Sequence, residues 1–232
     1  MRIDILTIFP QMFDCVLNES ILKRAQEKGK LWFIVHNLRD YTVDKHKKVD
    51  DKPFGGGPGM IMQVQPIHDA LKEICKLSKI GKKQRRIILL SPQGKTMEQK
   101  VATRLSKYKH LILICAHYEG VDERVRKYLA DEEISIGDYV LTGGELPAMV
   151  LVDAVTRLIP GVLGKKESLH QESFHDNLLE YPQYSRPADF KGMKVPTVLL
   201  SGDHNKIKDY RKKESLRITK EKRPDLFKKY KT

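Results

Sequence analysis

The sequence predicts an α/β protein with a parallel sheet, followed by a small, mainly helical C-terminal domain. Within residues 1–160, short apolar segments alternate with helical patterns, which is typical of parallel sheets with crossover helices. Beyond them the chain contains several prolines, and a basic helical pattern begins near Asn205. With 232 residues, the chain is long enough to bury the core of a large domain and to carry a smaller one.

The N-terminal part alternates strands and helices in the way that a parallel sheet requires. The predicted strands are four apolar segments, residues 2–9, 31–38, 86–90 and 110–116. The predicted helices are one that Asn18 caps and Gly29 ends, one that starts at Pro66, one behind a capping box of Thr96 and Gln99, and one over residues 121–129. Residues 134–149 are rich in glycine and lead into an apolar run that ends at Ile159.

A change in composition after Ile159 predicts a domain boundary. Residues 161–173 contain Gly, Ser and charged side chains, as is typical of a connector. We therefore expect a domain over residues 1–160, a connector over residues 161–173 and a domain over residues 174–232. The last of these includes a short predicted strand over residues 197–200.

The charge of the chain is high and unevenly distributed. The formal net charge is +13, and residues 204–232 hold twelve Lys and Arg against four Asp and Glu, a net charge of +8. A block of this kind attracts a polyanion, because binding releases the counterions condensed on it. The pattern favours a nucleic-acid partner, with a solvated, lysine-rich surface as the alternative.

Several function classes lack their sequence signals. No apolar run reaches the ~20 residues of a membrane helix, and the N-terminus, which shows no signal-peptide cleavage site, is interpreted as a strand. The three cysteines lie far apart and form no Cys-x-x-Cys pair, which favours a reducing cytoplasm and argues against disulfides and structural zinc. The chain has no P-loop and no Gly-x-Gly-x-x-Gly after its first strand. The eight histidines, His117 among them, lack metal-site spacing and are interpreted as core or surface residues.

Three glycine-containing turns are predicted at the carboxyl ends of strands. They are residues 91–94, 117–120 and 137–144. Ligands of parallel α/β sheets bind at this edge, and adjacent glycines let backbone approach backbone or ligand where a Cβ would clash. We therefore expect one shared pocket, with three unrelated turns as the alternative.

A fourth glycine-rich segment, residues 53–60, reads PFGGGPGM. Its two prolines restrict the backbone, so a functional loop is favoured over a flexible turn.

Two long segments carry a specific resemblance to a known family. They read ISIGDYVLTGGELPAM over residues 134–149 and FGGGPGM over residues 54–60. Together with the turns at 89–94 and 115–120, they resemble the bacterial tRNA (guanine-N1)-methyltransferases, which belong to the SPOUT, or α/β-knot, methyltransferases. The resemblance runs from Met1 to about Leu226. It implies a trefoil-knotted parallel-sheet domain, a homodimer, S-adenosylmethionine as cofactor, and methyl transfer to N1 of the guanosine 3′ of a tRNA anticodon.

The resemblance also implies which residues line the binding sites. The cofactor pocket would be lined by Leu90, Ser91, Pro92, Gln93, Ala116, Tyr118, Glu119, Gly120, Ser135, Ile136, Gly137, Asp138, Tyr139, Val140, Leu141, Gly143, Gly144 and Pro147. The family usually has Gly-Arg before Tyr-Glu-Gly, where this chain has Ala116-His117. The substrate would meet Asp50, Pro58 and Gly59, and the basic tail adds Arg211, Lys212 and Lys213 as expected tRNA-binding residues.

Methylation at N1 requires a base, because guanine N1 carries a proton. Negative charge then spreads toward O6, where a cation stabilises it. The family uses an aspartate of the connector and an arginine of the preceding helix, and the matching residues are Glu172 and Arg157. Asp176 and Glu180 lie nearby in the sequence as alternative acids. The sequence leaves the need for Mg²⁺ open.

Two other functions stay open at this point. A related knot methyltransferase could act on a ribose 2′-OH or on rRNA. A non-catalytic tRNA-binding protein could keep the fold, but the nearly complete set of motifs disfavours that alternative.

Overall fold

The computed structural model describes residues 1–164 and 172–231. The chain divides into two compact units, Met1–Gly164 and Lys165–Thr232. Residues 165–171 of the predicted connector lie outside the described residues. No helix in the described parts of the chain is long and apolar enough to cross a membrane.

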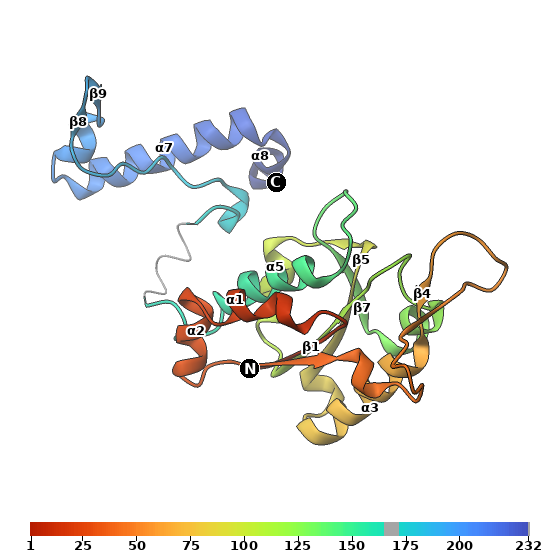
Figure 1. Ribbon diagram of the computed structural model, residues 1–232. Helices are drawn as coiled ribbons and strands as arrows, with labels where there is room; N and C mark the ends of the chain where they lie inside the picture. The colour runs from red at the N-terminus through yellow and green to blue at the C-terminus, as the bar shows by residue number, and fades with distance from the viewer. Residues whose placement is uncertain (165–171, 232) are drawn as a thin grey trace. The chain divides into compact units, whose positions relative to one another are not determined.

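A five-stranded parallel sheet forms the centre of the N-terminal unit (Figure 1). Its strands are β1 (Arg2–Thr7), β2 (Trp32–Asn37), β5 (Arg85–Thr96), β6 (His110–Cys115) and β7 (Glu132–Ser135), in the spatial order β2-β1-β6-β5-β7. Every residue of β6 is buried, because this apolar strand pairs with a strand on each side and is covered on both faces. The α/β fold class predicted from the alternation of segments is confirmed. The trefoil knot stays a prediction.

Two hydrophobic clusters cover the two faces of this sheet. One includes residues of α1 (Asp14–Leu17), α2 (Ser20–Glu27), α4 (Gln99–Leu105) and α5 (Glu145–Thr156). The other includes residues of α3 (Val64–Ser78), η2 (Leu38–Tyr41) and η4 (Val125–Leu129). Ile5 of β1 belongs to the first cluster and Leu6 to the second, since successive side chains of a strand point to opposite faces. Figure 1 shows α1, α2 and α5 on one side of β1 and α3 on the other.

Four local predictions differ from the structure. Asn18 ends α1 instead of capping α2, and its Nδ2 donates to Asp14 O (2.8 Å). Thr96 is the last residue of β5, and α4 begins without a side-chain cap. The helix predicted over residues 121–129 is reduced to the π-helical turn η4. Residues 197–200 form the 3₁₀ helix η6 (Thr197–Leu200) and not a strand, because so short an apolar run fits either structure.

A short hairpin carries the glycine-rich loop. Its strands are β3 (Asp50–Asp51) and β4 (Ile61–Met62), which pair antiparallel. The loop between them contains Gly55, Gly56 and Gly57, where an added Cβ would meet nothing within 4 Å. The tip of the loop is therefore exposed, whereas its ends are fixed by the hairpin.

The C-terminal unit is small and mainly helical. Its elements are η5 (His175–Asn177), the hairpin of β8 (Asp189–Phe190) and β9 (Met193–Lys194), η6, α7 (His204–Lys222) and α8 (Pro224–Lys231). Asp203 caps α7, because its side chain accepts from the N–H groups of Asn205 and Lys206. Ser215 Oγ donates to Leu179 O (2.6 Å), and the N–H of Leu179 donates to Thr219 Oγ1 (2.8 Å). These bonds hold the segment before β8 against α7.

Candidate functional site

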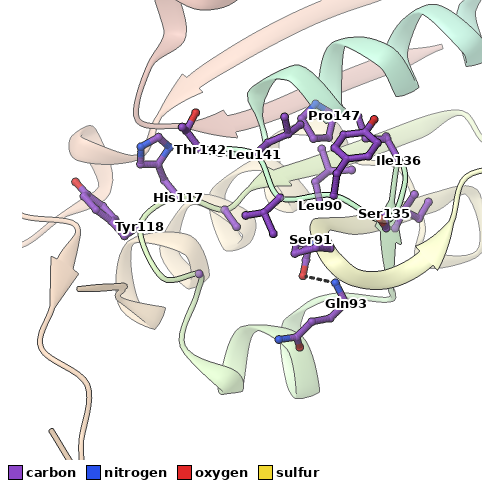
Figure 2. Close-up of a pocket in the computed structure, with 18 of the residues that line it drawn as sticks. Leu90, Ser91, Gln93, His117, Tyr118, Ser135, Ile136, Leu141, Thr142 and Pro147 are labelled. Carbon is purple, nitrogen blue, oxygen red and sulfur yellow. Dashed lines mark hydrogen bonds between the residues drawn. The ribbon is translucent and has the colours of Figure 1, made fainter. Parts of the chain in front are cut away.

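A pocket of the N-terminal unit brings together the three glycine-containing turns (Figure 2). It is lined by every residue predicted to bind the cofactor except Asp138. The N–H of Tyr139 donates to Gly137 O (3.0 Å), which makes Asp138 the central residue of a γ-turn. Four further residues line the pocket: His117, Arg126, Ile134 and Thr142.

The first turn, residues 91–94, interrupts β5 and does not end it. The strand pairs with β7 before and after the turn, since Leu90 and Lys95 both lie opposite Ile134. The N–H of Gln93 donates to Ser91 Oγ (3.2 Å), as Figure 2 shows. The prediction that the strand ends at residue 90 was therefore wrong. The turn still reaches the pocket, because Leu90 is level with the last residue of β6.

The second turn follows β6 and is hydrogen-bonded to the glycine-rich loop. Within the turn, the N–H of Gly120 donates to His117 O (3.0 Å). The N–H of Glu119 donates to Met60 O (3.0 Å), and the N–H of Met62 donates to Gly120 O (2.9 Å). The end of the glycine-rich loop is thus attached to one wall of the pocket.

The third turn joins β7 to α5 and packs against the end of β6. The N–H of Gly144 donates to Ala116 O (2.7 Å). A Cβ on Gly144 would lie 2.7 Å from Cys115 Cα, so glycine alone allows this approach without a backbone shift. At the start of the turn, Ser135 Oγ donates to Gly137 O (2.9 Å). Backbone groups and small side chains therefore make up much of the pocket wall.

Exposed apolar side chains form the rim of the pocket. Tyr118, Tyr139, Val140 and Leu141 all line it and are exposed to solvent. Apolar surface gathered at the mouth of a pocket is typical of a site that binds a ligand or a partner.

The residues predicted to meet the substrate lie on the β3–β4 hairpin and its loop. Asp50 pairs with Met62, and its carbonyl accepts from Gln63 Nε2 (3.1 Å). Pro58 is exposed in the loop. A Cβ on the neighbouring Gly59 would lie 2.4 Å from Glu119 Cγ, so the loop contacts a side chain that lines the pocket.

The two predicted catalytic residues belong to different units. Arg157 follows the last residue of α5, is half-buried, and donates its backbone N–H to Asp153 O (3.3 Å). Glu172 is half-buried in the C-terminal unit. There it lines a cavity together with both alternative acids, Asp176 and Glu180.

Two of the three predicted tRNA-binding cations contact aromatic rings. The Arg211 guanidinium lies 4.7 Å from the ring centroid of Tyr181, and Lys212 Nζ lies 4.8 Å from that of Tyr230. Lys213 is exposed. Arg211 and Lys212 therefore contribute to packing within the unit as well as to its positive charge.

His117 is a pocket residue that the sequence analysis missed. Its ring meets the rings of Phe9 and Tyr118 edge-on, at centroid distances of 5.0 and 5.2 Å. His117 Nδ1 lies 3.7 Å from Oε2 of Glu145, which is buried and accepts from Thr7 Oγ1 (2.7 Å). The signal that could have identified His117 is its place within the second turn, directly before Tyr118.

The family is identified by comparison with known proteins. The family model described as tRNA (Guanine-1)-methyltransferase TrmD matches residues 1–229. Curated relatives named tRNA (guanine-N(1)-)-methyltransferase include one from Geobacillus kaustophilus, 59% identical over 99% of this chain and 93% of its own length. The relative from Clostridioides difficile is 55% identical over 99% of this chain and 98% of its own length. The relative from Bacillus pumilus is 56% identical over 100% of this chain and 94% of its own length. Because these matches extend over nearly the whole chain, the chain belongs to the tRNA (guanine-N1)-methyltransferase family.

Proposed function

We propose that the protein transfers a methyl group from S-adenosylmethionine to N1 of the guanosine 3′ of the anticodon in tRNA, as a cytoplasmic enzyme. The observation that carries the proposal is the pocket built from three turns, with the glycine-rich loop hydrogen-bonded to its wall. The relatives described above are named for guanine-N1 methylation of tRNA, which supports the reaction class.

The pocket has the character that a nucleoside cofactor requires. Leu90, Ile136 and Pro147 offer apolar surface to a flat ring (Figure 2). Backbone groups of the turns can pair with the polar edge of that ring, and the absent side chain at Gly144 keeps the wall compact. When bound, S-adenosylmethionine supplies an electrophilic methyl group. The residues of the chain bind the cofactor, orient it and exclude water.

Glu172 is the proposed general base, and Arg157 is the proposed cation. Glu172 accepts the N1 proton, which leaves N1 able to attack the methyl group, and Arg157 stabilises the charge that develops toward O6. Both roles follow from the resemblance, with glutamate in place of the family's aspartate. Asp176 and Glu180 are the alternative bases, because they share a cavity with Glu172.

The C-terminal unit is the proposed source of affinity for tRNA. Its last part, residues 204–232, carries the net charge of +8 noted above, and α7 contributes Arg211, Lys212 and Lys213. Contacts from such side chains to phosphate give binding that weakens as salt rises.

The proposed active form is a homodimer. Phe9, Met12 and Leu146 are exposed and line one surface hollow of the N-terminal unit. Val150 is also exposed and lies one helical turn beyond Leu146 on α5. Apolar surface of this kind is typical of the core of an interface.

Methylation of tRNA with S-adenosylmethionine, followed by nuclease digestion and mass spectrometry, tests the function. The expected product is N1-methylguanosine directly 3′ of the anticodon. A 2′-O-methylated product, or methylation of rRNA in place of tRNA, would replace the proposal with the activity of a related knot methyltransferase. Bound but unmodified tRNA would indicate a non-catalytic binding protein.

The same assay with and without EDTA tests the need for Mg²⁺. Among the residues that the structure describes, no three His, Cys, Asp or Glu side chains are grouped as a metal site requires. A contributing Mg²⁺ ion is therefore expected to be held partly by the substrate, as this ion commonly is.

A further inference from the structure

His117 and Glu145 form a side-chain pair between two walls of the pocket. His117 belongs to the second turn, and Glu145 is the first residue of α5, directly after the third turn. His117 Nδ1 lies 3.7 Å from Glu145 Oε2. The backbone joins the same two turns, since His117 and Gly143 form an isolated antiparallel bridge. The pair thus lies where the two turns meet, and Figure 2 shows His117 beside Thr142 at one end of the pocket.

Glu145 is a buried carboxylate that requires compensation. Only 2% of its surface is exposed. Thr7 Oγ1 donates to Oε1 (2.7 Å), and the start of α5 adds a favourable dipole. In the described parts of the chain, His117 is the one basic side chain that pairs with it. A cation stabilises a buried carboxylate more than a neutral group does, so a basic side chain at residue 117 suits this site.

The absence of a side chain at residue 143 allows this pair to form. A Cβ on Gly143 would lie 2.3 Å from Glu145 Oε2 and 2.4 Å from His117 Nδ1. His117 Nδ1 is buried and makes no hydrogen bond to the described residues. The carboxylate of Glu145 is therefore the charged group that this nitrogen faces.

Among the described residues, the other groups around the His117 ring offer it no ion pair. The aromatic and apolar neighbours are Phe9, Tyr118 and Met62, whose Sδ accepts the backbone N–H of His117 (3.1 Å). Glu119 and Arg126 are the other charged side chains of the pocket lining, and neither forms an ion pair with His117 within the described residues. Burial and the charge of Glu145 raise the pKa of the Cys115 thiol well above its ordinary value. Cys115 therefore stays neutral near neutral pH and adds no charge beside Glu145.

We propose that His117 is a positioning residue for the cofactor pocket: its side chain, paired with Glu145, holds the second and third turns together when S-adenosylmethionine binds. Without the basic side chain at residue 117 the two turns lose this link, and cofactor affinity falls. This inference rests on the proposed function for the identity of the ligand. It concerns binding alone, because His117 neither forms nor breaks a bond.

Calorimetric titration of the full-length protein with S-adenosylmethionine tests the inference. We expect His117→Gln, which cannot form an ion pair, to bind the cofactor about 10-fold more weakly than the wild type. His117→Arg keeps a basic side chain beside Glu145 and should restore most of that affinity.

A matched control comes from a second histidine–carboxylate pair. His68 on α3 lies 2.8 Å from Asp69, is exposed and does not line the pocket, so His68→Gln should keep the wild-type affinity. In a Glu145→Gln background, His117→Gln should cost little further affinity, and if that background fails to fold, the single His117 variants still decide. The inference is wrong if His117→Gln keeps the wild-type affinity, or if His117→Arg binds as weakly as His117→Gln. A folded wild-type protein that binds no S-adenosylmethionine overturns the proposed function, and this inference with it.

Discussion

Glu172 shares its cavity with two other acids. Variants of single residues are therefore needed to show which of these carboxylates acts as the base. Glu172→Gln keeps the size and hydrogen bonding of the side chain but cannot accept the N1 proton. We expect turnover to fall roughly 10²- to 10⁴-fold, with cofactor and tRNA affinity little changed. Higher pH should recover the rate, because solvent then removes the proton. Single-turnover methylation across pH measures both effects.

Three companion variants sharpen this test. Asp176→Asn changes a carboxylate of the same cavity and should keep near wild-type rates, and Glu172→Asp should stay active because it retains the acid. Arg157→Ala should be slow for a different reason, the uncompensated charge at O6, and should recover poorly at higher pH. A slow Asp176→Asn beside an active Glu172→Gln would move the role of base to Asp176.

Gly144 tests the close packing of the pocket wall. In Gly144→Ala the new Cβ would lie 2.7 Å from Cys115 Cα and 2.9 Å from Ala116 N, so backbone at the end of β6 must move. We expect S-adenosylmethionine to bind roughly 10- to 100-fold more weakly and the melting temperature to fall. Gly81→Ala is the control, because nothing lies within 4 Å of a Cβ there. Calorimetry that gives equal affinities for both variants would contradict the assignment.

At the scale of elements, the central strands share a buried charge. Asp4 of β1 is fully buried and is hydrogen-bonded to His110 (2.6 Å), His36 (2.7 Å) and the Arg2 guanidinium (2.6 Å). Burial alone would raise the pKa of Asp4, but these bonds outweigh it and hold the pKa well below its usual range. The ionised carboxylate thus ties β1 to both neighbouring strands.

The lowered pKa makes this strand contact sensitive to acid. Its stabilisation is complete above the pKa of an unfolded aspartate, ~3.9, and is lost as pH falls below that value. Asp4→Asn should lower the free energy of unfolding by about 3 kcal/mol or more at neutral pH, and its stability should decline less steeply in acid. Urea unfolding at a series of pH values measures this. Asp51→Asn, at an exposed carboxyl, should leave the acid profile unchanged.

Side chains of helix α7 contribute both to packing within the C-terminal unit and to its positive charge. Variants of two of its residues distinguish the two contributions. Lys213→Ala should weaken tRNA binding and reduce by about one the slope of log affinity against log salt concentration. The melting temperature should not change, because Lys213 is exposed. Arg211→Ala should lower both tRNA affinity and melting temperature, since its guanidinium packs on Tyr181. Filter binding across salt, with thermal melting, tests both. Lys83→Ala, at an exposed lysine of the N-terminal unit, is the control for loss of one charge.

Tertiary pairing explains one difference between the predicted and observed elements, the length of β5. The apolar runs predict the buried strands well, because period and hydrophobicity are local. The continuation of β5 past Leu90 depends on pairing with Ile134, which no local pattern shows. The contact of His117 with Glu145 is likewise invisible to local patterns, because the two residues lie far apart in the chain.

At the scale of the whole molecule, the resemblance predicted more than the local patterns could. The residues that it assigns to the cofactor pocket, apart from Asp138, line the observed pocket, and their binding of a cofactor stays a prediction. The resemblance also supplied the roles of Glu172 and Arg157, which stay predictions. Hydrophobic patterning alone does not distinguish a residue that binds a cofactor from one that shapes a turn.

The proposed homodimer leads to a prediction about the mass of the whole molecule. Val150→Glu places a charge on the exposed apolar face of α5, and we expect the mass measured by light scattering to fall to that of one chain, because a buried unpaired charge disfavours association. Leu77→Glu, on the exposed surface of α3, should keep the wild-type mass. A Val150→Glu protein with the mass of the wild type would show that this face of α5 lies outside the interface.

The attachment of the glycine-rich loop bears on how substrate preference can change during evolution. The base of the loop is fixed where Met60 and Met62 bond to the second turn. At its tip, Gly55, Gly56 and Gly57 have open space around them. Insertions or replacements at the tip therefore alter what the loop can reach without displacing the turn that lines the pocket. Under the proposed function, selection could then change how this segment recognises RNA while binding of the methyl donor stays unchanged.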